Sequence, residues 1–402
     1  MWTLTKWTGR MPNLNPAVLT WARETAGLSL DLAARQLGIK SQKTTGAELL
    51  LRYESGEKEV SRPLLLKMVN LYRRPLLTFY LPQPPAIADR GVDFRSVRDE
   101  LKIESRGNLD ALVRDLFTRQ SLIKEALADL DEATRLDYVG SVNPDRTTVE
   151  EAAEYIIQLL DFEIAKYRRS RRPEDAFNYL RNLVESKGCF VFLIGNLGTH
   201  HTNIPVEAFR GFAIADQIAP LIVVNDQDSV QARNFTIIHE LAHVLAGATG
   251  LSGSNFSSDI EKWCNDIASA VLFPDSEELE FQDFQLENFD RLTAQINNYA
   301  QYRNLSATHV AYRLYIRGRI SLETWERLAT RYRELWLRYR QTQREERDGS
   351  SGPDYYVVKK HKVGSAAVSL VQRTMSEGML TATKAATLLG VKAGAVYKMV
   401  GV

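Results

Sequence analysis

The sequence predicts an α+β fold that is mostly helical, with a small sheet near the middle of the chain. Apolar residues recur at three- and four-residue intervals through both ends of the chain, which is the spacing of helices. Three short strand-like runs occur close together between residues 189 and 225. The 402 residues are 44% hydrophobic, which allows sizeable cores in two to four domains.

The composition excludes several classes of protein. Lys and Arg total 51 against 50 Asp and Glu, so a uniformly basic nucleic-acid coat is excluded, although a local basic patch is not. Two cysteines, Cys189 and Cys264, are too few for a disulfide framework. Residues 1–16 lack the apolar segment of a signal peptide, and no apolar run approaches the roughly 20 residues that span a bilayer. We therefore expect a cytoplasmic protein that does not engage a membrane.

Residues 1–81 are expected to form a bundle of short helices. Their helical apolar spacing is interrupted at Gly27 and Gly38, where glycine favours a helix end. Residues 82–140 are expected to hold a linker followed by a charged helical segment. The linker is indicated by the proline-rich, polar stretch 82–91.

Helices and strands alternate in residues 141–284, which we predict to be one domain. Thr148 and Glu151 form a capping box that opens a helix. A second helix is expected to begin at Pro173 and to end at Gly188. The strand-like runs that follow are residues 189–195, 211–216 and 220–225.

The segment Phe235–Gly247, FTIIHELAHVLAG, is nearly all apolar yet carries three polar groups at helical spacing. His239 and His243 share one face of a helix, where two imidazole nitrogens can hold one zinc ion. Glu240 lies beside them and can take a proton from a water bound to the metal. Because burying these groups without partners would be costly, the apolar setting favours a metal site.

A catalytic zinc requires a third protein ligand and an open position for water. A second buried helix, within residues 257–274, places Glu261 in its first turn and Asn265 on the same face. Glu261 is the predicted third ligand, and Asn265 could orient one of the histidines. The alternative for Glu261 is a solvated carboxylate favoured by the helix dipole. The rival ligands are Asp259, Asp266 and the softer Cys264.

Several linked motifs resemble the ImmA/IrrE metallo-endopeptidases over residues 190–275. They are GFAIADQIAPLIVVND, then RNFTIIHELAHVLAG, then IEKWCNDIASAVLFP. The resemblance implies a zincin-like, gluzincin-type core, with a small sheet beside two metal-bearing helices and Glu261 as a ligand. It also implies an intracellular endopeptidase that cuts a partner transcriptional repressor in a stress, mobile-element or phage-related circuit. In zincins an edge strand pairs with an extended peptide, and 211–216 or 220–225 is the candidate edge.

The N-terminal segments LSLDLAARQLGI and LLRYESGEKEVSRPLLLKMVNLYRRPLLTFYLP resemble an XRE-type helix-turn-helix. Such domains are often fused upstream of this peptidase. The stretch IKSQKTTGAE between them is several residues longer than the usual turn. A protein-docking module is the alternative to a DNA-binding domain. If the domain binds DNA, the expected contacts are Lys40, Ser41, Gln42, Lys43 and Thr44.

Residues 285–350 are expected to form a helical domain, in which alternating Arg and Glu indicate a solvated, salt-bridged helix. The tail, residues 351–402, is expected to be a small helical element. Its Ala386, Gly390 and Val396 fall at helix-turn-helix spacing. A helical cap or a dimerisation element accounts for the same pattern.

We therefore predict a zinc metallo-endopeptidase acting on a protein substrate, with DNA binding possible through the N-terminal helix-turn-helix. Mn²⁺ and Fe²⁺ also suit such a site. His200 and His201, in a loop between strands, could steady an oxyanion, or could simply be solvated. The alternative function is a DNA-binding transcription regulator, or a toxin-antitoxin or phage-defence component, whose metal site is structural or vestigial.

Overall fold

The computed structural model divides into two compact units. The first comprises Met1–Arg90 and Arg98–Arg114, and the second comprises Gly91–Val97 and Asp115–Val402. Among the described residues, no helix is both long and apolar enough to cross a membrane. The structure describes residues 14–40, 44–85, 103–198, 202–252, 259–277, 284, 286–347 and 354–401.

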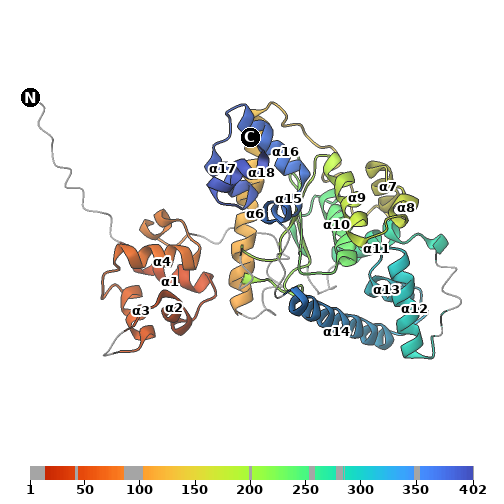
Figure 1. Ribbon diagram of the computed structural model, residues 1–402, viewed down its shortest axis with the longest axis horizontal. Coiled ribbons are helices and arrows are strands. Elements are labelled where there is room, and N and C mark those ends of the chain that lie inside the picture. Colours follow the sequence, from red (N-terminus) through yellow and green to blue (C-terminus); the bar gives the residue numbers. More distant parts are fainter. Residues whose placement is uncertain are drawn as a thin grey trace, which may run out of the picture. The chain divides into compact units, whose positions relative to one another are not determined.

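The first unit is a bundle of short helices, drawn in red to orange in Figure 1. Its core is formed by buried apolar side chains such as Leu19, Leu50 and Met68, and the predicted helical bundle is confirmed. Of the expected DNA contacts, Lys40 is exposed and Thr44 is half-buried, whereas residues 41–43 (Ser41, Gln42 and Lys43) lie outside the described residues. The helices are α1 (Pro16–Thr25), α2 (Leu30–Leu37), α3 (Gly46–Glu54), α4 (Arg62–Tyr72) and the 3-10 helix η1 (Leu76–Tyr80).

A buried ion pair joins α1 to α3 in this unit. Arg23 Nε lies 2.8 Å from Glu54 Oε1, and Arg23 Nη2 lies 3.0 Å from Glu54 Oε2. Replacing Glu54 by alanine leaves the guanidinium buried without its carboxylate, so we expect the unit to lose about 3–5 kcal/mol of stability. Hydrogen–deuterium exchange in the full chain should show faster exchange across α1 and α3. Glu57→Ala, which removes an exposed carboxylate, should change exchange little, and equal protection in the two variants would contradict the prediction.

The second unit is built on a four-stranded sheet with the order β1-β3-β2-β4. β1 is parallel to β3, and β2 is antiparallel to both of its neighbours. The three predicted strands are present, and β4 was not predicted. The prediction that the second or third strand forms an edge is wrong, because β4 covers β2 and β1 covers β3. The strands are β1 (Phe190–Leu193), β2 (Gly211–Ile214), β3 (Leu221–Val224) and β4 (Gly250–Ser252).

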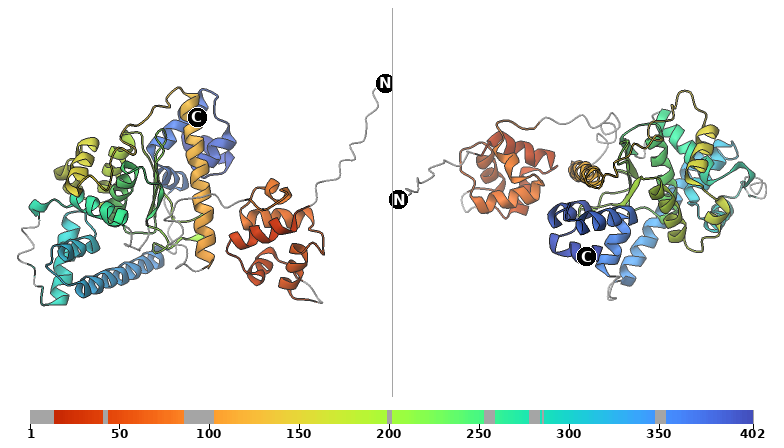
Figure 2. Two further views of the ribbon diagram at one scale, coloured as in Figure 1. Left: turned by 180° about the vertical axis from the view of Figure 1, so that it is seen from behind. Right: turned by 90° about the horizontal axis from the view of Figure 1, so that it is seen from above.

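Helices cover both faces of this sheet, as Figures 1 and 2 show, and β1, β2 and β3 are accordingly buried along their whole length. On one face, α9 (Pro173–Ser186) and α10 (Val230–Leu245) pack over side chains such as Val191 and Ile222. On the other face lies the part of α6 (Ile103–Asp129) that belongs to this unit, where the rings of Phe117 and Phe212 meet with centroids 6.0 Å apart.

Further helices surround α10 on its side of the sheet. One hydrophobic core continues from Tyr138 to Tyr332, so the helices after residue 284 share it with the alternating region before them. The predicted capping box of Thr148 and Glu151 is confirmed at the start of α7. The helices are α7 (Val149–Leu160), α8 (Ile164–Arg168), α11 (Asp259–Leu272), α12 (Phe289–Tyr302), α13 (Ala307–Ile316) and α14 (Leu322–Arg347).

The last four described helices are short: α15 and α16 pack against β1, α16 also packs against α9, and α17 and α18 pack against α16. They are drawn in blue in Figure 1. Lys384 Nζ lies 2.8 Å from Glu125 Oε2, which joins them to α6 as well. The finer division of this unit at residues 284 and 350 stays a prediction. The helices are α15 (Tyr355–Val363), α16 (Ser365–Ser376), α17 (Ala382–Leu389) and α18 (Ala393–Val400).

Candidate metal centre

α10 carries both histidines of the motif, and a buried hydrogen-bond network fixes its first half. Ser229 caps the helix by accepting from the backbone N–H of Ala232. Asn234 Nδ2 donates to the hydroxyl oxygen of Tyr167 at 2.8 Å, and that hydroxyl donates to the carbonyl of Asn304 at 2.7 Å. The network links α10 to α8 and to the end of α12, so the helix that presents the histidines cannot shift independently.

α11 carries Glu261 and packs along α10. Near its start, Trp263 Nε1 donates to the carbonyl of Thr147 at 3.2 Å. At its end, the carbonyl of Leu272 accepts from Arg168 Nη2 at 2.6 Å. With both ends held, the carboxylate in the first turn of α11 is placed against the histidine face of α10.

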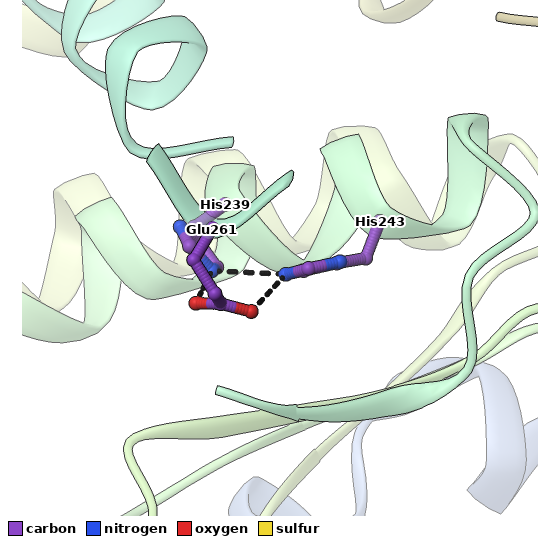
Figure 3. A group of neighbouring side chains, drawn as sticks. All are labelled: His239, His243 and Glu261. Carbon is purple, nitrogen blue, oxygen red and sulfur yellow. Dashed lines mark hydrogen bonds and ion pairs between the residues drawn. The ribbon is translucent and has the colours of Figure 1, made fainter. Parts of the chain in front are cut away.

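His239, His243 and Glu261 converge on one point, as Figure 3 shows. The two Nε2 atoms are 3.1 Å apart. Glu261 Oε1 lies 3.0 Å from Nε2 of His243, and Oε2 lies 3.4 Å from Nε2 of His239. The three residues are 4%, 3% and 8% exposed, so the group is buried.

These distances fit a divalent cation at the point of convergence. Four donors placed 2.0–2.1 Å from a tetrahedral ion lie roughly 3.3 Å from one another, close to the separations found here. The set consists of two imidazole nitrogens and a carboxylate, which zinc prefers. Two lone-pair nitrogens facing each other beside an anion also repel unless a proton or a metal ion lies between them. His239, His243 and Glu261 are therefore the residues that could hold the metal.

Burial is the largest influence on the pKa values of these three residues. Burial lowers the pKa of His239, although Glu261 and Asn265 oppose the shift. Burial also opposes a charge on His243, but Cys264, Glu261 and Glu240 outweigh it and hold its pKa well above the ordinary value. Burial would raise the pKa of Glu261, yet the two histidines lower it to about 2. The site thus keeps an anionic carboxylate ready for a cation.

The positions of the nearby side chains decide between the candidate third ligands. Asn265 lies near His239 and Cys264 lies near His243, but neither belongs to the converging donors. Asp266 Oδ2 accepts from Lys262 Nζ at 3.2 Å, on a different side of α11. Asp259 is exposed. Of the candidate third ligands, the structure brings Glu261 to the histidines.

The comparisons with known proteins place these residues in a family domain. Residues 197–315 match the Peptidase_M78 family model, the IrrE N-terminal-like domain. No curated protein and no solved structure gives a significant match. The Peptidase_M78 match supports the ImmA/IrrE family and a peptidase for this part of the chain. It covers β2, β3, α10, β4 and α11, which hold the converging donors, and extends into α13.

Within the Peptidase_M78 region, Glu240 is completely buried and its carboxylate lies against the backbone of β2 at Gly211. A methyl group on Gly211 would lie 2.6 Å from both Glu240 Cδ and Thr236 Cγ2, which is closer than carbon atoms approach. Glycine is therefore required for Glu240 to keep its place beside the metal ligands. Gly211 is a positioning residue that sequence reasoning missed; the only signal was a glycine at the start of a strand.

We expect Gly211→Ala to lower the rate of peptide cleavage by about 10- to 100-fold, because a displacement of about 1 Å is enough to misalign a proton carrier. The three atoms nearest to this methyl position belong to Glu240 and Thr236 and not to His239, His243 or Glu261, so the metal content should stay unchanged. Turnover and elemental analysis on the same preparation would check both expectations. Ala213→Gly, a change of equal size on the same strand, serves as the control. A Gly211→Ala protein with wild-type turnover would show that the glycine does not position Glu240.

His200 and His201 lie outside the described residues. Their predicted contribution to an oxyanion site therefore stays a prediction. His309, by contrast, is described: its Nε2 lies 3.0 Å from the hydroxyl of Ser269, and burial lowers its pKa to about 3. A ring that is neutral and held in this way is part of the packing beneath Phe235 rather than a metal ligand.

Proposed function

We propose that the Peptidase_M78 region is a zinc-dependent endopeptidase. The observation that carries this proposal is the convergence of His239, His243 and Glu261 in tetrahedral spacing, with Glu240 one residue along the same helix. Zinc, when bound by these three residues, would polarise a peptide carbonyl and acidify a water molecule. Mn²⁺ or Fe²⁺ could take its place under other availability.

Glu240 is the proposed proton carrier of the reaction. Its carboxylate accepts a proton from the attacking water, whose oxygen adds to the peptide carbonyl carbon. As the carbon–nitrogen bond breaks, Glu240 returns that proton to the leaving nitrogen, so atoms and charge balance. Its place on α10, between the two histidines in sequence, supports this assignment. Complete burial keeps the carboxylate out of bulk water.

The proposed substrate is an extended segment of a DNA-binding transcriptional repressor. A zincin-like site takes its peptide as an added strand, which requires a sheet edge. β1 is one edge, and α15 and α16 pack against it. β4 is the other edge and follows α10 directly, so we propose that the substrate pairs with β4.

Mass spectrometry of new protein N-termini would test the proposal even while the substrate is unidentified. Zinc-loaded protein is incubated with a lysate of the host cell, beside an equal amount of Glu240→Gln protein. We expect new N-termini that appear only with the wild type, that vanish when zinc is chelated, and that include a DNA-binding protein. Identical sets of N-termini in the two incubations would rule out an endopeptidase.

The first unit favours a second candidate function. Its helical bundle, α1 to α4, is the observation behind a DNA-binding transcription regulator, or a toxin-antitoxin or phage-defence component, with a structural metal site. In such a protein the metal would stabilise the fold, and Glu240 would not take part in a reaction. A Glu240→Gln protein that regulates its target genes as the wild type does would favour this function. In the endopeptidase, the first unit would recognise DNA or the repressor.

A further inference from the structure

We infer that α17 and α18, at the end of the chain, form a helix-turn-helix that binds duplex DNA through the outer face of α18. This binding site is separate from the metal centre and does not depend on the proposed peptidase activity. Four observations carry the inference: the turn between the two helices, their packing, the residues on the outer face, and the distribution of charge.

The turn between α17 and α18 has the length and backbone of a helix-turn-helix. α17 ends at Leu389 and α18 begins at Ala393, so three residues join them. The first of the three, Gly390, adopts the left-handed conformation with φ 65° and ψ 39° that ends α17. Helix-turn-helix motifs join their helices through three or four residues that often include glycine. In the first unit, by contrast, residues 38–45 separate α2 from α3.

The two helices form a fixed pair rather than a flexible tail. Apolar side chains on their facing sides are buried, and α16 packs against both as a third helix. The turn packs closely against α6. A methyl group on Gly390 would lie only 2.6 Å from Arg119 Nη2 of that helix. The outer face of α18 is thus presented on a rigid support. The buried side chains are Ala385, Ala386, Leu388 and Leu389 of α17, and Val396, Met399 and Val400 of α18.

The outer face of α18 carries small and basic residues at helical spacing. Gly394, Tyr397 and Lys398 lie three and four residues apart, so they share one face, and all three are exposed. Among the described residues, no atom outside the adjacent helix backbone lies within 4 Å of the place where Gly394 would carry a methyl group, so this part of the helix is open to an approaching surface. Lys392 caps the start of the same helix and is exposed. Recognition helices contact base edges mainly through residues near their N-terminus.

The charge of this element suits a polyanion. Residues 354–402 contain seven Lys and Arg against two Asp and Glu, a net charge of +5 in a chain whose net charge is only +1. Residues 378–402 contain no acidic residue at all. Lys384 and Arg373 are already paired with Glu125 and Glu132, whereas Lys392 and Lys398 are exposed, with the Lys398 amine 6.0 Å from the centre of the Tyr356 ring of α15. Lys392 and Lys398 can therefore contact phosphates or guanine edges.

Duplex DNA explains these features together better than a protein partner does. A protein-docking face would be expected to concentrate apolar side chains, whereas the large apolar side chains of α17 and α18 are buried except for Tyr397. An exposed glycine and alanine at the start of a basic helix instead let the helix backbone approach base edges closely. Tyr397, which is 52% exposed, is next to Lys398 on α18 and can contact the sugar–phosphate backbone.

Fluorescence anisotropy with the full chain would test the inference, using a fluorescein-labelled duplex of random sequence about 30 base pairs long. Gly394→Glu adds a carboxylate to the open face of α18, and Gly394→Ala adds only a methyl group in the same space. We expect Gly394→Glu to weaken binding at least about tenfold and Gly394→Ala to bind within about twofold of the wild type, because the carboxylate repels phosphate.

The salt dependence gives an independent measurement. We expect the double variant Lys392→Ala, Lys398→Ala to reduce the slope of log affinity against log salt by about 1.8, since each phosphate contact contributes about 0.9. Arg373→Ala, which removes a cation already paired with Glu132, should leave the slope unchanged. Two outcomes would overturn the inference: a wild type that does not bind the duplex, or a Gly394→Glu protein that binds as tightly as Gly394→Ala. Circular dichroism of each variant would verify that α17 and α18 remain helical.

Discussion

Replacing Glu240 by glutamine is expected to lower peptide cleavage by about 10²–10⁴-fold while the protein keeps its metal. Glutamine has nearly the same shape as glutamate, so it fits the completely buried space against Gly211. It cannot accept and return a proton in the way a carboxylate does. Glu240 is not among the three converging donors, and therefore its loss should not release the ion.

Cleavage of a peptide that spans the cut site found in the lysate would measure this effect. Elemental analysis of the same sample would show whether the metal remains. Glu150→Gln is the matched control, because it makes the same chemical change on the exposed surface of α7. A Glu240→Gln protein with full activity and bound zinc would exclude Glu240 as the proton carrier, whereas loss of both metal and activity would assign it a structural role.

The helices that carry the site could be predicted because helical spacing and capping depend on residues that are close together in the sequence. The spacing of His239 and His243 depends only on the period of the helix, so two imidazoles on one face followed from the sequence. The capping box of Thr148 and Glu151 is equally local, and the structure shows both of its hydrogen bonds. Glu261, in the first turn of the following helix, was predicted as the third donor from ligand spacing, and the resemblance to a family strengthened that prediction over the other acidic residues.

The parts that could not be predicted depend on contacts between distant segments. β4 has three residues and no recognisable periodicity, yet its pairing with β2 changes which strands form the edges. The close approach of Glu240 to Gly211 exists only after α10 has packed over the sheet. The amino-acid composition likewise does not predict that one hydrophobic core continues from Tyr138 to Tyr332. The sequence therefore predicts which helices present the donors better than it predicts what surrounds them.

Replacing Glu261 by alanine is expected to remove the metal and, with it, peptide cleavage. The remaining imidazoles, His239 and His243, would hold an ion through two bonds only, fewer than the three protein ligands of a catalytic zinc site. They would also lose the carboxylate that favours a positive charge at this point. We expect zinc affinity to fall by more than about 100-fold, beyond the 10- to 100-fold effect of residues that only orient a ligand.

Neighbouring residues of α11 make this second prediction a graded series. Asn265→Ala removes a polar neighbour of His239 but no converging donor, so zinc affinity should fall by about 10- to 100-fold. Asp266→Asn, which removes a charge paired with Lys262, should leave zinc affinity unchanged. Titration of the metal-free variants with zinc, followed by a competing chelator, would rank the three. If Asp266→Asn lost more zinc than Glu261→Ala, the ligand would be misassigned, and a series with no difference would show that the two histidines and Glu261 do not bind the ion together.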